Sequence, residues 1–142
     1  MATSRTPKEF GRRMRIQAAG LAKGVEQLIR GTFLVVDQVA VIETPIDTGL
    51  ARANWIASTT VPAEGENPPD ITGGQALQQA QSVVGTYRLE FGPIMVTNNV
   101  SYIIFLDQGS SRQSPKGMTA AALNAGIQHI RKNVTGKILP TG

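Results

Sequence analysis

The stretch Thr44-Pro45-Ile46-Asp47-Thr48-Gly49 divides the chain into a helical part and a part rich in strand-forming residues. Because the ring of Pro45 clashes with the backbone of the preceding residue, that residue is driven out of the α region, and a helix arriving from the N-terminal side should end there. Asp47 and Thr48 can bond to nearby backbone amides, and Gly49 can adopt a positive φ, so the stretch is typical of a tight turn. We expect a structural corner in which Asp47 holds the turn through backbone hydrogen bonds.

A helical pattern fills the sequence before this corner. From Phe10 to Ile42, apolar or small residues recur at steps of three and four, which is typical of one face of a helix. We expect this face to lie against the protein core. Gly31 favours a kink. Gly20 and Gly24 lie one turn apart, and an alternative interpretation is that they permit the close approach of another helix from a second subunit. The stripe comprises Phe10, Met14, Ala18, Leu21, Val25, Leu28, Thr32, Val35, Val39 and Ile42.

After the corner, the composition changes to that of β-strands. The segments Ala53–Val61 and Thr86–Thr97 are rich in β-branched, aromatic and apolar residues, which predicts two strand regions, the second with a bulge or a bend at Gly92-Pro93. Trp55 is the only tryptophan, and its large apolar area predicts a core anchor. Residues 62–74 are rich in proline, glycine and acidic side chains, so we expect a long exposed loop there.

Two further helices complete the expected fold. A short one is predicted at Gln75–Val84, although the glutamines there also suit a loop, and a final one at about Met118–Lys132. The apolar run Val100–Leu106 is too short to assign from its periodicity. Residues from 133 onward are expected to form a loose tail. The sequence therefore predicts one α+β domain over residues 1–142, in which a long N-terminal helix and a C-terminal helix pack on a small, mainly antiparallel β-sheet.

Charge is segregated along this chain, whose net charge is +4. Residues 1–31 carry seven basic and two acidic side chains, residues 32–110 carry two and eight, and residues 111–142 carry five and none. Basic ends suit contact with nucleic-acid phosphates. They suit equally the pairing of one copy's ends with the acidic middle of a neighbouring copy.

Composition disfavours several classes of protein. The absence of cysteine removes disulfides, thiolate nucleophiles and zinc-thiolate sites, and a lone histidine, His129, argues against a histidine metal site. We expect no cofactor. No apolar run reaches the roughly eighteen residues that span a membrane, and the basic start of the chain is not followed by an apolar signal core. We therefore expect a soluble, non-secreted protein that does not contact a membrane.

The triplet Asp47-Thr48-Gly49 has the letters of an aspartic-protease active site. Catalysis of that kind needs two aspartates that share a proton, so a single copy would require a two-fold dimer. In those enzymes the triplet sits between strands, whereas here it follows a predicted helix. The sequence contains no Gly-x-Ser-x-Gly, phosphate-loop or dinucleotide-binding motif. We expect no enzyme activity.

The order of elements and three sets of residues, the third at the start of the final helix, resemble the tail-completion (neck) proteins of tailed bacteriophages. The first set is the long helix closing in Thr44-Pro45-x-Asp47-Thr48-Gly49, followed by Leu50, Arg52 and Asn54-Trp55 at the start of a strand. The second set is an asparagine before a tyrosine-containing apolar segment, then an acidic residue and a glycine, matched by Asn98 or Asn99, Tyr102, Asp107 and Gly109. A final helix led by Pro115 follows, and the resemblance covers about Phe10 to Lys132.

Two departures from the family pattern affect its detailed contacts. The family commonly has adjacent glutamate and glycine after the tyrosine segment, whereas Gln108 stands here between Asp107 and Gly109. The acidic loop at residues 62–74 looks like an insertion.

The resemblance implies a non-enzymatic virion protein that is assembled in the host cytoplasm and placed at the head–tail junction. It implies a cyclic homo-oligomer, a hexamer or a dodecamer, that contacts tail terminator or tail tube proteins on one face and head connector proteins on the other. Genomic DNA would pass through the ring. The alternatives are a tail terminator, a head-connector stopper, and, more remotely, a DNA-binding accessory protein.

Overall fold

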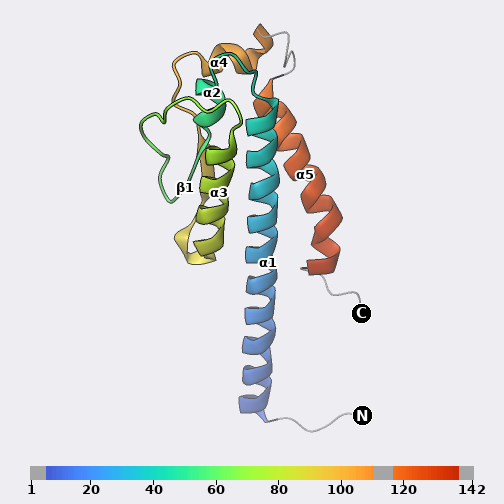
Figure 1. Cartoon of the computed structure of the whole chain (residues 1–142). Coiled ribbons are helices and arrows are strands. Elements are labelled where there is room, and N and C mark those ends of the chain that lie inside the picture. Colours follow the sequence, from blue (N-terminus) through green and yellow to red (C-terminus); the bar gives the residue numbers. More distant parts are fainter. Residues whose placement is uncertain (1–5, 111–116, 138–142) are drawn as a thin grey trace.

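The computed structural model describes residues 6–110 and 117–137, and these residues form a mostly helical molecule with one small sheet (Figure 1). The motif proline Pro115 lies outside the described residues. In chain order the elements are α1 (Pro7–Glu43), α2 (Leu50–Ala53), β1 (Ile56–Thr59), α3 (Gly74–Thr86), η1 (Leu89–Phe91), β2 (Ile94–Thr97), α4 (Ile103–Phe105), the π-helical turn η2 (Leu106–Ser110) and α5 (Met118–Lys137).

Helix α1 is the central element and has well-defined ends. Thr6 caps its start: the side-chain hydroxyl of Thr6 accepts the N–H of Glu9, while the carboxylate of Glu9 accepts the N–H of Thr6. With Pro7 as the first helical residue, this is a complete capping box. At the other end, Thr44 takes an extended conformation with ψ of 124°, as expected of a residue before proline. The sequence favours a kink at Gly31, and α1 passes through that residue as one continuous α-helix.

Helices α5 and α3 pack along the C-terminal half of α1, one on either side (Figure 1). Gly126 allows the close approach of α5, because a Cβ at that position would lie 2.6 Å from Cγ2 of Val36. His129 lies against Gly31, and its Nδ1 is 3.0 Å from the Thr32 hydroxyl. The core is centred on residues of α1, α3 and α5 with Trp55. Its buried members include Ala40, Val41, Trp55, Ala76, Met118 and Ala122.

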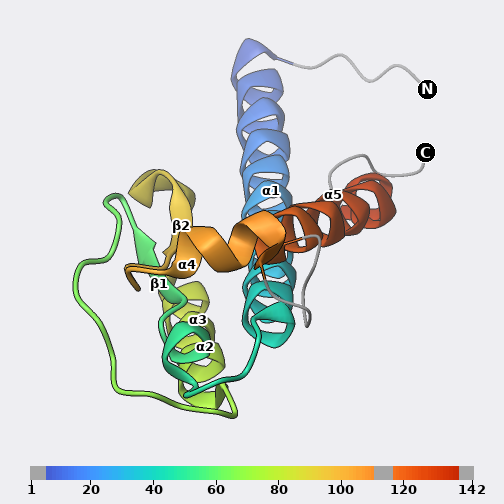
Figure 2. The ribbon, with the colours of Figure 1, turned by 90° about the horizontal axis from the view of Figure 1, so that it is seen from above.

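The sheet has two antiparallel strands, in which Ile56 pairs with Thr97 and Thr59 with Ile94. The predicted α+β class, with two terminal helices and a small antiparallel sheet, is confirmed. However, α5 packs mainly on α1 and not on the sheet. Figure 2 shows the segment from α4 to η2 crossing from β2 to the start of α5.

Both strands are shorter than the sequence patterns indicated. In the second region, residue 86 ends α3, Tyr87 caps that helix, and η1 precedes the strand. The ring of Tyr87 is buried, its hydroxyl donates to the Gly92 carbonyl at 2.8 Å, and its own carbonyl accepts from the guanidinium of Arg30. These contacts turn the backbone before the strand starts. Gly92 has φ of 80°, but it ends the turn η1 before β2 begins, so no bulge or bend falls within a strand there.

The expected core stripe of α1 is only partly in the core. Leu28 is buried, but the N-terminal members of the stripe are exposed: 61% of Phe10, 51% of Met14 and 50% of Leu21. The reason is tertiary, because α3 and α5 accompany only the C-terminal half of α1 (Figure 1). Gly24 is buried, whereas a Cβ added at Gly20 would have no neighbouring atom within 4 Å. The most buried face of the helix instead includes Phe33, Asp37, Ala40 and Val41.

Two further predictions concern chain segments outside the main helices. Residues 62–73 do form a largely exposed loop, and α3 begins at Gly74. The loose tail predicted from residue 133 is wrong for residues 133–137, which extend α5 to Lys137. Residues 138–142 lie outside the described part of the chain.

Candidate functional site

The corner at Thr44–Gly49 is tied to the core through a buried hydroxyl. Thr44 is fully buried, and its hydroxyl donates to the Ala40 carbonyl at 2.6 Å. The same oxygen accepts the indole N–H of Trp55 at 2.7 Å. Trp55 is itself buried, which confirms the predicted core anchor. Two hydrogen bonds that share the Thr44 hydroxyl therefore join the end of α1 to Trp55, the residue before β1.

Arg52 satisfies the open carbonyls at the end of α1. Its Nη2 donates to the carbonyls of Ile42 and Thr44, both at 2.9 Å, and its Nη1 donates to that of Ile71 at 3.2 Å. The last turn of α1 has no basic residue of its own, so α2 supplies the positive charge that favours a helix C-terminus. The sequence pattern included Arg52 but did not reveal this role.

The loop at residues 62–73 returns to the corner and packs on Gly49. This glycine has φ of 84°, and a Cβ on it would lie 2.6 Å from the backbone nitrogen of Ile71. The Gly49 carbonyl accepts the N–H groups of both Ala53 and Asp70. Gly73 is similarly restricted, because it has φ of 71° and a Cβ there would clash with Cγ1 of Val41. Gly49 therefore serves the turn, as predicted, and also the seating of the loop.

Three asparagines hold the same loop and the start of the second motif. Asn54 is fully buried: its side-chain amide donates to the carbonyls of Leu50 and Asn67 and accepts the Asn67 N–H. Asn98 donates to the Ala51 carbonyl at 2.9 Å. Asn99 donates to the loop carbonyls of residues 63 and 65. The two sequence motifs, far apart along the chain, therefore meet in one place.

The side chain of Asp47 does not have its expected role. Asp47 is exposed, and none of the described residues donates a hydrogen bond to its carboxylate. Thr48 holds the turn instead, because its hydroxyl accepts the Leu50 N–H at 3.3 Å. The capping carboxylate in this region is Asp70, which accepts the N–H groups of Thr72 and Gln75 before α3. The hydrogen bond from Gln75 is the main cause that lowers the pKa of Asp70.

Asp107 occupies a comparable position at α5. Its Oδ1 accepts the Thr119 N–H at 2.7 Å, so it caps the start of that helix. Its carbonyl oxygen occupies the space that a Cβ of Gly117 would need, and Gly117 has φ of 86°. Gly109 belongs to the π-helical turn η2. Asp107 and Gly109, both motif residues, thus shape the connection between the corner and α5.

A hollow of about 420 Å³ lies over the corner, and both motifs contribute to it. Asp47 and Tyr102, one from each motif, are among its lining residues. Apolar side chains exposed nearby in sequence are Ile46, Ile104, of which 64% is exposed, and Phe105. We call Ile46, Asp47, Tyr102 and Phe105 the corner surface. The hollow is lined by Pro45, Asp47, Thr48, Gly49, Leu50, Ala51, Tyr102 and Leu106.

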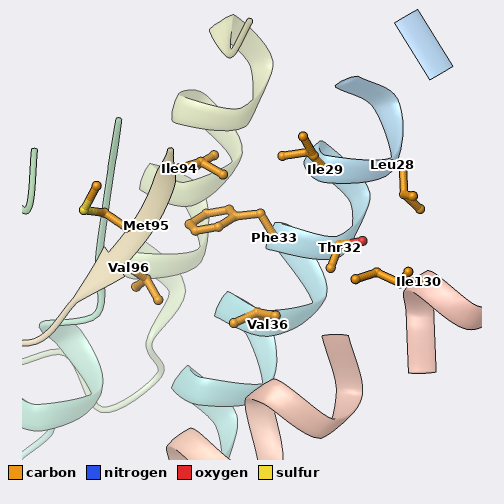
Figure 3. A pocket seen from close by; sticks show the side chains of 9 residues that line it. All are labelled: Leu28, Ile29, Thr32, Phe33, Val36, Ile94, Met95, Val96 and Ile130. Carbon is orange, nitrogen blue, oxygen red and sulfur yellow. The ribbon is translucent and has the colours of Figure 1, made fainter. Parts of the chain in front are cut away.

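A second hollow, of about 300 Å³, is almost wholly apolar. Figure 3 shows Phe33 of α1 directed toward Ile94 and Val96 of β2, with Ile130 of α5 beside Thr32. The hydroxyl of Thr32 is the one polar side-chain group in the lining of this hollow, and it lies 3.0 Å from Nδ1 of His129. A hollow with this lining offers apolar contact and no group for proton transfer. Its walls are Leu28, Ile29, Thr32, Phe33, Val36, Ile94, Met95, Val96 and Ile130.

Within residues 6–110 and 117–137, no group of three or more acidic or histidine side chains is arranged to hold a metal ion. In the same ranges, no helix combines the length and apolar character needed to cross a membrane. Comparison with protein-family models, curated proteins and solved structures found no match. The family resemblance therefore rests on the residues of the two motifs.

Replacing Asp47 with alanine should leave the free energy of unfolding within about 0.5 kcal/mol of the wild type, as for an exposed side chain without a structural contact. Replacing Asp70 with alanine should lower the midpoint of urea unfolding several times more than Asp47→Ala does, because it removes a helix cap. Urea unfolding of the two variants measures both effects. A loss of stability for Asp47→Ala equal to that for Asp70→Ala would restore the turn-holding role for Asp47.

Proposed function

We propose that this protein is a non-enzymatic structural component of the head–tail junction of a tailed bacteriophage, a neck or tail-completion protein. In this proposal it assembles as a closed ring that joins the tail to the head connector, with genomic DNA passing through. The observation that carries the proposal is the convergence of the two family motifs at the corner. Asp47 and Gly49 from the first motif line one hollow together with Tyr102 from the second.

The chemistry of this surface favours binding to protein. Tyr102 and Phe105 are both exposed and, three residues apart in a helical segment, lie on one side of it. Exposed apolar groups that gather on one surface are typical of interaction sites. The buried polar groups beneath, such as those of Asn54 and Thr44, bond to the protein's own backbone. They hold the corner in shape and do not face the hollow as reactive groups.

Labelling the protein in virions tests this function. The phage that encodes the chain would be grown with a short epitope tag after residue 142, and purified particles would be imaged with gold-labelled antibody. We expect label between head and tail, and a phage lacking the protein should accumulate separate heads and tails. Particles that carry no label, or label spread along the tail, would exclude a place at the junction. Tagged major tail protein, which labels the tail throughout, is the control.

A further inference from the structure

The N-terminal half of α1 is an amphipathic helix without a partner among the described residues. We call Pro7–Lys23 the arm; Figures 1 and 2 show it projecting beyond every other described element. Phe10, Met14 and Leu21 lie on one side of it and are each at least half exposed. A helix of this length, about 25 Å, is marginal in water by itself. It gains stability if another surface covers the stripe.

The charges of the arm indicate what that surface should be. The arm carries five basic side chains and one acidic one, so two arms would repel each other. The opposite end of the molecule is acidic: Glu43, Asp47 and Asp107 lie in or beside the corner, and the loop anchored to it adds Glu64, Glu66 and Asp70. Among the described residues, Arg52 is the basic residue near the corner, and its guanidinium donates to the carbonyls of Ile42 and Thr44. The basic charge and exposed apolar side chains of the arm are thus complementary to the acidic charge and exposed apolar side chains at the corner.

We propose that the arm of one copy docks on the corner surface of a second copy. The stripe of Phe10, Met14 and Leu21 covers the apolar side chains of Tyr102 and Phe105, which lie three residues apart on one side of a helical segment, and arm cations face the acidic rim. The contact is heterologous, because donor and acceptor lie at opposite ends of α1, and repeated contacts of this kind form a ring when the rotation closes. The inference rests on the proposed function only in requiring self-association, and it names the two surfaces that meet.

Two complementary variants give the main test. The arm variant carries Phe10→Ser and Met14→Ser, and the corner variant carries Asp47→Lys and Phe105→Ser; all four positions are exposed. Light scattering after gel filtration should find each variant alone as a single 15.1 kDa chain, while the wild type associates. An equal mixture should form a complex of two chains and stop there, since it contains one intact arm and one intact corner per pair. Circular dichroism checks that both variants keep their helices.

A contact between two arms or between two corners predicts something different. With paired arms the corner variant, whose arm is intact, would associate by itself, and with paired corners the arm variant would do so; either result would overturn the inference. So would a wild type that remains a single chain at every concentration tested. If the wild type associates and neither variant weakens the association, the two inferred contact surfaces are wrong, but the proposed ring is not contradicted. If the arm–corner complex forms but particles carry no label at the junction, the proposed function fails and the contact stands.

A matched pair of charge reversals separates this contact from nucleic-acid binding. By helical spacing, Arg13 borders the apolar stripe, whereas Arg12 lies on the opposite side of the arm. Arg13→Glu should weaken self-association by about tenfold or more, and Arg12→Glu by less than about threefold. Equal losses, together with binding to duplex DNA that falls steeply with salt, would overturn the inference and assign the arm to DNA.

Cross-linking of the unmodified protein gives a measurement that does not depend on variants. A carbodiimide joins lysine amines to carboxylates in direct contact. Lys8 and Lys23 are separated from Glu43 by roughly 50 Å and roughly 30 Å along α1, so a link from either lysine to Asp47, at the far end of that helix, must join two copies. We expect such links in mixtures of isotope-labelled and unlabelled chains. Links confined to the arms of two copies would contradict the proposed contact.

Discussion

Replacing Asp37 with asparagine should raise the free energy of unfolding by on the order of 4 kcal/mol above about pH 7, and change it little near pH 4. Asp37 is 1% exposed in the middle of α1, and its Oδ1 has no hydrogen-bond partner among the described residues. Burial raises the pKa of Asp37 from its ordinary value of 3.8 to about 7. Leu34 and Leu77 form the apolar part of its surroundings, with Gln38 and Gln81 at the edge.

The direction of this pH dependence follows from the protonation of Asp37 in the folded and the unfolded protein. Between pH 3.8 and about pH 7 the unfolded chain loses the proton of Asp37 while the folded protein keeps it, so stability falls as the pH rises through this window. Each pKa unit corresponds to about 1.4 kcal/mol, and above about pH 7 the loss is complete. Asparagine has nearly the same shape and does not ionise, so it escapes this loss.

Urea unfolding of wild type and Asp37→Asn at a series of pH values measures the effect. Asp70→Asn is a control of opposite sign: its pKa is lowered by the hydrogen bond from Gln75, so its ionised form favours folding and the variant should lose stability at neutral pH. A difference between wild type and Asp37→Asn that is the same at pH 4 and pH 8 would show that the buried carboxyl ionises as it does in the unfolded chain.

Replacing Trp55 with alanine should destabilise the protein by about 3–5 kcal/mol, the range for removing a large aromatic side chain from a core. Trp55 packs in the main core cluster with Val41 and Met118. Its loss also removes the N–H that bonds the buried Thr44 hydroxyl. Because Trp55 is the only tryptophan, unfolding of the variant must be followed by circular dichroism and not by indole fluorescence.

Two milder variants separate the packing of Trp55 from its hydrogen bond. Trp55→Phe keeps most of the apolar volume and leaves the Thr44 hydroxyl without its donor, so it should cost about 1–2 kcal/mol. Thr44→Val leaves the indole N–H unbonded and should cost a similar amount. The double variant should cost less than the two losses added together, because neither buried partner is then left alone. Simple additivity would indicate that the bond contributes nothing specific.

Several local features could be predicted from particular residues. Thr6, Pro7 and Glu9 have the pattern of a capping box, which by itself indicates that α1 starts at Pro7. Pro45 ends the helix at Thr44 by a clash with its nearest neighbour. Both signals act within a few residues, and local sterics and hydrogen bonds determine them fully. The prediction of a buried Trp55 was also correct, because few surfaces other than a core can cover an indole.

The functions of side chains at the corner required the fold. Asp47 and Thr48 are adjacent, both can cap a turn, and only the backbone geometry shows that Thr48 does so. Asp70 and Thr72 stand before a helix, which is a signal for the cap found there. The bonds of Arg52 to the end of α1 join residues of different elements, so no local pattern indicates them.

By itself the sequence determined where α1 begins and ends, the need for glycine at position 49, and the α+β class, because capping, proline sterics and composition act locally. Only the tertiary structure decided which face of α1 is buried. The apolar stripe runs from Phe10 to Ile42 without a break, but α3 and α5 reach only its C-terminal half, so Phe10 and Met14 stay exposed while the titratable Asp37 is enclosed. Burial depends on which elements lie alongside a residue, and the periodicity of one helix contains no information about its neighbours.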